Sequence, residues 1–248
     1  AIGEPGAPAE NNIPNPNPQT PFDPDDPNAV WDISQQFSAT INPGDYWSYG
    51  WGAGMNDFHL YDTGTPRTDG NPSWYSSGMD PAEFPQLWKN LGSMIWGVPH
   101  NTVAEHPSPT LLAKARWTSV IKDVVACTGS FGAGSTGSVD MFIIKDGARV
   151  LLESYNTAVE VPFDVRMAVV PGTTIDFVVG AGADNYYSDD TPLNIQITRS
   201  ELRCQDLTAH MSADLNQDCY VNLEDFALLA QNWLKCNDPM DPACTDVP

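Results

Sequence analysis

Oxygen-bearing side chains recur at a regular spacing near the C-terminal end of the chain. Within residues 214–225 they stand at loop positions 1, 3, 5, 9 and 12: Asp214, Asn216, Asp218, Asn222 and Asp225. A hard cation such as Ca²⁺ takes six to eight oxygen ligands, and a loop with this spacing supplies them once the main-chain carbonyl of position 7, Tyr220, is added. An Asx-rich turn that holds no metal is the alternative. The spacing therefore predicts a calcium site with Ca²⁺ as the cofactor.

The residues that follow the loop have the period of an amphipathic helix. We predict a helix over residues 223–235. One face collects its apolar side chains: Phe226, Leu229, Ala230, Trp233 and Leu234. The loop departs from the EF-hand pattern at two positions: Asp225 replaces a longer glutamate at position 12, and Cys219 replaces the glycine of position 6. Because position 6 lies in a sharp turn, we expect backbone strain at Cys219.

The aspartate at position 12 and the run Asp-Phe-Ala-Leu-Leu-Ala that begins there resemble one repeat of a dockerin domain, over about residues 206–235. Dockerins carry two such repeats, and this chain contains one. A single helix-loop-helix is too small to bury both of its faces, so its apolar face needs a partner surface in the same chain or in a neighbour. We expect Ca²⁺ to order this unit, because its carboxylates repel one another without the ion.

Composition limits the classes of partner and compartment. The 248 residues include 11 lysines and arginines against 32 aspartates and glutamates, a net charge of −21. Such a surface repels nucleic acid and anionic membranes. There is no apolar run of 18 residues, so no membrane span is expected. The sequence has five cysteines, and its start, Ala1-Ile2-Gly3, is like a mature end left by signal cleavage. Both features predict a secreted protein, at the cell surface or outside the cell.

Residues 1–29 form an extended arm rich in proline and asparagine, a composition that favours polyproline II over a packed core. A flexible linker is the simplest interpretation. An arm that is ordered must dock on something, and this one has few apolar side chains with which to hold its own domain. We therefore expect it to dock on copies of the same chain, along a sheet edge or a groove, and so to build a homo-polymer. Docking on its own domain is the alternative.

Residues 30–199 have the alternation of a mainly β domain. Short strands are expected at residues 31–34, 36–41 and 47–51, with long loops and short strands over 62–109. Further strands are expected at 111–117, 119–131, 138–144, 149–155, 157–170, 174–180 and 193–199, separated by Gly- and Asp-containing turns. Many strands at this spacing without intervening helices predict an antiparallel β-sandwich or jelly roll. Residues 200–248 then form the helical calcium unit.

The order of several sequence pieces in this domain resembles a jelly-roll module of secreted and surface-attached bacterial proteins, a module that looks like a carbohydrate-binding module. The resemblance covers about residues 31–198. The matching pieces include Trp47-Ser-Tyr-Gly-Trp51, Arg116-Trp117-Thr118, Val139–Gly147 and Gly172–Gly180. It implies a jelly roll and binding of an extracellular glycan, and it implies no ligand residue in particular.

Three groups of residues in the sandwich are candidate sites. Trp47, Tyr49 and Trp51 share one strand face and could stack on sugar rings, although such a stripe is more often core. A second calcium could bind in the acidic loop made by Asp184, Asn185, Asp189 and Asp190, which could equally be a solvated turn. His100 and His106 could form a metal pair, with hydrogen-bonded histidines as the default.

The cysteines predict a stapled C-terminal tail. The candidates for disulfides are Cys204, Cys219, Cys236 and Cys244. One pairing closes the loop 236–244 and joins Cys204 to Cys219; the other joins Cys219 to Cys244. Cys127 is the odd cysteine, expected as a buried thiol on a strand.

No motif of nucleophilic, phosphate-binding or zinc-dependent catalysis occurs in the sequence. We therefore expect a protein that is not an enzyme. The first hypothesis is a secreted, calcium-binding structural protein that assembles through residues 1–29 into an extracellular polymer or surface layer. The second is a carbohydrate-binding module anchored or docked through its dockerin-like repeat.

Overall fold

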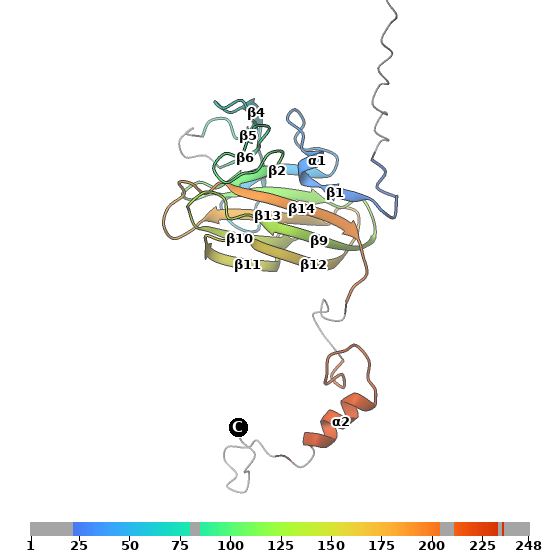
Figure 1. Ribbon diagram of the computed structural model, residues 1–248. Coiled ribbons are helices and arrows are strands. Elements are labelled where there is room, and N and C mark those ends of the chain that lie inside the picture. Colours follow the sequence, from blue (N-terminus) through green and yellow to red (C-terminus); the bar gives the residue numbers. More distant parts are fainter. Residues whose placement is uncertain (1–21, 80–84, 204–210, 233–234, 236–248) are drawn as a thin grey trace, which may run out of the picture.

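The computed structural model describes residues 22–79, 85–203, 211–232 and 235, and most of them belong to two antiparallel β-sheets packed face to face (Figure 1). In spatial order, the first sheet contains β12 (Val161–Val169), β9 (Asp123–Phe131), β14 (Thr191–Arg199), β7 (Val103–His106), β6 (Gln86–Lys89), β5 (Pro72–Tyr75) and β4 (Thr63–Pro66), and β1 (Val30–Asp32) also pairs with β14. The second contains β11 (Arg149–Thr157), β10 (Val139–Lys145), β13 (Thr174–Ala181), β8 (Leu112–Thr118), β2 (Trp47–Gly52) and β3 (His59–Leu60).

The connections between β8 and β14 pass repeatedly from one sheet to the other. As a result, β9 pairs with β12 and β14, whereas β10 pairs with β11 and β13. The pairs β9–β12, β9–β14 and β10–β13 join strands that are not consecutive, and such pairing across two sheets is the arrangement of a jelly roll. The predicted mainly β, antiparallel sandwich is confirmed, and so are the short strands expected between residues 62 and 109.

Large aromatic side chains fill the space between the sheets. Trp31, Tyr49, Trp117, Phe131 and Phe177 are all buried there. Because side chains alternate along a strand, the residues between them point to the outer faces of the sheets. Cys127 on β9 is the free, buried thiol that the sequence predicts.

The chain departs from the predicted strands at its first turn. Strands were expected at residues 31–34 and 36–41, but β1 ends at Asp32 and helix α1 (Ile33–Gln36) follows. The Asp32 carboxylate accepts hydrogen bonds from the amides of Ser34 and Gln35, both at 2.9 Å. An aspartate that caps amides in this way starts a helical turn. Alternating apolar residues could not reveal that local preference.

Residues 22–29, the end of the proline-rich arm, lie on the sandwich of their own chain. The ring of Phe22 is 5.5 Å from that of Trp31 and 5.0 Å from that of Tyr46. The Arg199 guanidinium donates to the carbonyls of Pro24 and Asp26. For this segment the structure shows docking on its own domain, the alternative to docking on a second copy. Residues 1–21 lie outside the described residues, so assembly through them stays a prediction.

Helix α2 (Leu223–Asn232) begins at the predicted residue, within the last positions of the acidic loop 214–225. The described helix is shorter than the predicted 223–235. Among the described residues, none of the helices has both the length and the apolar character needed to cross a membrane.

Candidate functional site

The acidic loop 214–225 is folded in on itself, with its two end carboxylates turned inward. Asp214 and Asp225 are buried, although both lie in a short surface segment. Asp214 accepts from the amides of Asp218 and Cys219 at 3.1 and 2.9 Å. Asp225 accepts from the amides of Leu215, Asn216 and Asn222. The two ends of the loop are therefore tied to its middle and to each other.

Hydrogen bonds from the loop amides lower the pKa of the Asp225 carboxyl. The amide of Asn222 has the largest effect, followed by those of Asn216 and Leu215. Side chains at the intermediate positions are linked as well: the Asn216 amide nitrogen donates to the Asp218 carboxylate at 2.9 Å. Hydrogen bonds thus connect these predicted ligands within the loop, but among the described residues no three of its acids group as a metal site. Tyr220, predicted to contribute its carbonyl, holds its side chain out in solvent.

The backbone of the loop takes left-handed conformations at Gln217, with φ 60°, and at Cys219, with φ 73°. The strain expected at Cys219 is confirmed, because a non-glycine residue rarely adopts such angles. Cys204, Cys236 and Cys244 lie outside the described residues, so the two disulfide pairings stay predictions.

The apolar face of α2 is exposed in the described unit. Phe226 is 65% exposed and Leu229 43%. Both residues border a hollow of about 250 Å³ with Leu215 and Val221. The partner surface expected for this face stays a prediction, and Trp233 and Leu234 lie outside the described residues.

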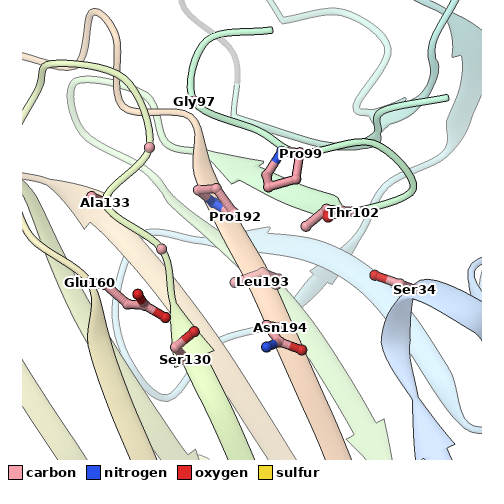
Figure 2. Close-up of a pocket in the computed structure, with 12 residues that line it drawn as sticks. Ser34, Gly97, Pro99, Thr102, Ser130, Ala133, Glu160, Pro192, Leu193 and Asn194 are labelled. Carbon is pink, nitrogen blue, oxygen red and sulfur yellow. The ribbon is translucent and has the colours of Figure 1, made fainter. Parts of the chain in front are cut away.

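A cavity of about 470 Å³ opens on the outer side of the first sheet (Figure 2). Asn194 on β14 and Ser130 on β9 are directly paired neighbours, and both side chains point away from the core. Ser34 of α1, Thr102 and Glu160 add further polar groups, while Pro99 and Pro192 give the cavity apolar walls. Donors and acceptors from separate chain segments thus surround one open space.

Close contacts between backbones fix the loops that wall this cavity. A Cβ on Gly97 would lie 1.8 Å from the Gly134 carbonyl oxygen, and a Cβ on Gly134 would lie 1.9 Å from the Asp190 carbonyl oxygen. Both glycines also have positive φ, 77° and 63°. Only glycine fits at either position, so the 95–98 turn, the 132–137 loop and residues 189–191 are locked together.

The aromatic stripe on β2 is core, so the predicted sugar platform is wrong for two of its three members. Trp47 and Tyr49 are buried between the sheets, where no sugar can reach them. Trp51 is half-buried; its indole donates to the Ser76 hydroxyl at 2.8 Å and its ring stacks on His59 at 4.5 Å. The core interpretation, which the sequence favoured, accounts for this strand.

The four residues proposed as a second calcium site divide into separate environments. Asp190 turns toward the indole nitrogen of Trp88, 2.7 Å away, and lies 3.8 Å from Arg67. Asn185 accepts from the Tyr187 amide. Asp184 accepts from the Ser138 hydroxyl at 2.6 Å. Asp189 is buried, and neither of its carboxylate oxygens has a hydrogen-bond partner among the described residues.

The two histidines take the default role. His100 Nδ1 lies 2.9 Å from the Gly92 carbonyl oxygen, and His106 Nδ1 lies 2.7 Å from that of Pro107. Within the described part of the chain, no three histidine, cysteine, aspartate or glutamate side chains group as a metal site. A cation bound by the described residues would therefore need main-chain or amide oxygens as well.

The structure also contains a set of carbonyl oxygens around Lys114 that the sequence did not predict. The Lys114 side chain is fully buried, and its ammonium donates to the carbonyls of Gly54, Met55 and Asp57 at 2.7, 3.2 and 2.6 Å. Burial lowers the pKa of this amine, and the nearby Asp176 and Asp57 oppose the effect. A lysine at an outward-facing strand position was the only signal, and it gave no indication of the 53–58 loop folding over it.

No protein-family model matches this sequence, and comparison with curated proteins finds no relative. Similar solved structures include a family 35 carbohydrate-binding module from Clostridium thermocellum, with 9% identity and a TM-score of 0.31 over 47% of this chain and 92% of that one. A CBM51 from Clostridium perfringens, solved with methyl-galactose, gives 12% identity and a TM-score of 0.29 over 68% and 100%.

Tandem CBM51 modules of a family 98 glycoside hydrolase from Streptococcus pneumoniae give 15% identity and a TM-score of 0.33, over 67% of this chain and 51% of that one. These neighbours are carbohydrate-binding modules. Similarity at this level carries no argument about what the present chain binds.

Proposed function

We propose that this protein is a secreted, non-catalytic carbohydrate-binding protein that also binds calcium through residues 214–225. The main observation that supports glycan binding is the cavity of Figure 2, where Ser34, Thr102, Ser130 and Asn194 present neutral polar groups around an open space of about 470 Å³. Its size falls within the range of small-ligand sites, roughly 300–1,000 Å³. Neutral donors and acceptors beside proline walls suit a sugar better than a charged metabolite.

The cavity has one carboxylate, Glu160, among the residues that line it. Hydrolysis of a glycosidic bond usually requires two carboxyl groups on opposite sides of the bond. The site therefore suits recognition of a glycan and not its cleavage. The resemblance of the sequence pieces over residues 31–198 to a carbohydrate-binding module supports the same proposal.

Calcium binding through the 214–225 loop is supported by its inward carboxylates and its two left-handed residues. Asp214 and Asp225 are already buried and oriented by amides of the same loop. Carboxylate, amide and carbonyl oxygens form the ligand set that Ca²⁺ prefers. Bound Ca²⁺ neutralises Asp214, Asp218 and Asp225 and stabilises the start of α2.

Binding to the cavity is tested with a panel of soluble oligosaccharides and two matched substitutions on one face of β14. Asn194→Trp places an indole in the cavity, whereas Gln196→Trp places one two residues further along the strand. We expect the wild-type chain and Gln196→Trp to bind the same glycan, and Asn194→Trp to bind it at least tenfold more weakly. Equal loss in both variants, or binding by none of the three, contradicts the proposal.

Assembly into a polymer is the second candidate function, and the exposed apolar face of α2 favours it. Phe226 and Leu229 would then contact another copy of the chain. Sedimentation of the full chain with and without residues 1–21 tests the assembly. Monomers at all concentrations in both forms would exclude it.

A further inference from the structure

Asp189 is a buried acid that lacks a hydrogen-bond partner within the described part of the chain. The residue is 1% exposed, and neither carboxylate oxygen accepts a hydrogen bond from any described residue. A carboxylate removed from water without compensation costs several kcal/mol, so an ionised group in this position needs a positive charge nearby. The guanidinium of Arg67 instead lies beside Asp190 and against the rings of Trp88 and Trp96.

Two main-chain carbonyl oxygens lie near Asp189 Oδ1, on the side of Gly137. Gly137 has no side chain, and a Cβ there would lie 1.9 Å from Asp189 Oδ1, 3.0 Å from the Tyr187 carbonyl oxygen and 3.1 Å from that of Ser188. Asp189 Oδ1 and the carbonyl oxygens of Tyr187 and Ser188 therefore all lie against Gly137, close to one another. The Gly137 amide donates to the Ser188 carbonyl at 3.3 Å, which leaves that oxygen a second lone pair.

A second acid lies close enough to act on Asp189. The pKa of Asp189 is raised to about 7, most by burial and then by the charges of Asp184 and Asp190. Asp184 itself is held by the Ser138 hydroxyl, whose oxygen is 2.6 Å from Asp184 Oδ1 and 2.7 Å from Asn156 Oδ1. A hydroxyl has one proton to donate, so one of these two oxygen–oxygen contacts lacks a hydrogen. The region is thus rich in oxygen atoms and poor in hydrogen-bond donors.

We propose that Asp189 and the carbonyl oxygens of Tyr187 and Ser188, with Asp184 as the second negative charge, bind a hard divalent cation, and that this cation is calcium. Calcium accepts irregular sets of six to eight oxygens, and water completes such a set, whereas magnesium demands a near-ideal octahedron. Two carboxylates also balance the charge of one divalent ion. The site is separate from the 214–225 loop in sequence and in its ligands.

The position of this site gives the ion a second role. The 132–137 loop carries Gly137 against Asp189 at one end and Gly134 in the wall of the cavity at the other. An ion at Asp189 therefore holds the loop that shapes the cavity. This second statement rests on the proposed glycan site, whereas the cation site does not.

The experiment counts calcium ions per chain in the full-length protein by elemental analysis after removal of unbound metal. Asp189→Asn keeps the shape of the side chain and removes its charge, and Asp225→Asn does the same in the C-terminal loop. We expect each variant to hold one ion fewer than the wild type, and the double variant two fewer. An unchanged count in a folded Asp189→Asn protein overturns the site.

Asp184→Asn covers the case in which Asp189→Asn does not fold, because Asp184 is exposed. We expect its affinity for the corresponding calcium ion to fall at least tenfold, and an unchanged affinity overturns the site. A tenfold excess of Mg²⁺ should leave the calcium count unchanged; displacement by Mg²⁺ overturns the assignment to calcium. Glycan binding by the calcium-depleted Asp189→Asn protein at wild-type strength overturns only the second role, whereas absence of glycan binding in the wild type contradicts the proposed function.

Discussion

The two acidic loops of this protein hold their carboxylates in opposite ways. In the 214–225 loop, Asp214 and Asp225 accept hydrogen bonds from amides of the same loop, so both carboxylates have partners within the protein. In the 184–190 loop, Asp189 is buried, and neither of its oxygens has a hydrogen-bond partner among the residues that the structure describes. The two proposed calcium sites therefore rest on different observations, a regular spacing of acids in one loop and an unsatisfied buried acid in the other.

The three carbonyl oxygens around Lys114 hold a cation that belongs to the protein itself, so its contribution to stability can be measured by substitution. Lys114→Met removes the ammonium from three carbonyls and from the neighbourhood of Asp57, while the aliphatic part of the side chain is kept. Removing one partner of a buried charged group typically costs about 3–5 kcal/mol. We expect the melting temperature to fall by about 10 °C, since 1 kcal/mol shifts a domain of this size by about 2–4 °C.

Lys145→Met is the matched control for Lys114→Met, because Lys145 pairs with the neighbouring Asp146 near the surface. A surface pair of this kind contributes about 0–1 kcal/mol. Similar decreases in melting temperature in the two variants would show that the Lys114 ammonium contributes no more to stability than a surface ion pair does.

The C-terminal loop is tested by Asp225→Ala, which removes the acceptor of three loop amides and a calcium ligand together. We expect calcium affinity at this site to fall by about a hundredfold, which corresponds to about 2.7 kcal/mol. Hydrogen exchange of the α2 amides in the presence of calcium should speed up in the variant. Glu224→Ala, one residue away and exposed, should change affinity less than fivefold; equal effects would argue against Asp225 as a ligand.

Glu105 provides the contrast to Asp189, since it is also buried and its two oxygens lack partners among the described residues. Burial raises the pKa of Glu105 well above its usual value, and Asp176 adds to the effect. The protonated form therefore favours the folded state below the unfolded pKa, about 4.3. That stability is lost as pH rises toward the folded pKa.

The variant Glu105→Gln has no such proton to lose. Above pH 4.3, the free energy of unfolding of Glu105→Gln should increase relative to that of the wild type, by at most about 1.4 kcal/mol per pH unit. Chemical denaturation at several pH values in excess calcium measures the difference. A difference between the two proteins that does not change with pH would show that Glu105 is ionised in the folded state, as we propose for Asp189.

The sequence predicted local features well and distant ones poorly. The strands from β8 to β14 follow from alternation, and the start of α2 follows from its apolar period, because both patterns lie within a few residues. The α1 turn was missed because Asp32 caps it through its own side chain. The spacing of residues 214–225 is readable for the same local reason.

The cavity could not be predicted, because Ser34, Ser130 and Asn194 meet only through the pairing of β9 with β14 and the position of α1. The Asp189 cluster was located from its acids, but the distinction between Asp189 and Asp190 depends on which way each side chain turns. The Lys114 cage depends on three main-chain carbonyls, which no residue type reveals.

Hydrogen exchange of the full chain during a calcium titration of the metal-free protein tests the account most directly. Calcium should slow exchange in two separate segments, residues 211–232 and residues 132–137 with 184–190, at the calcium concentrations where each ion binds. Exchange that calcium leaves unchanged in both segments would contradict the account.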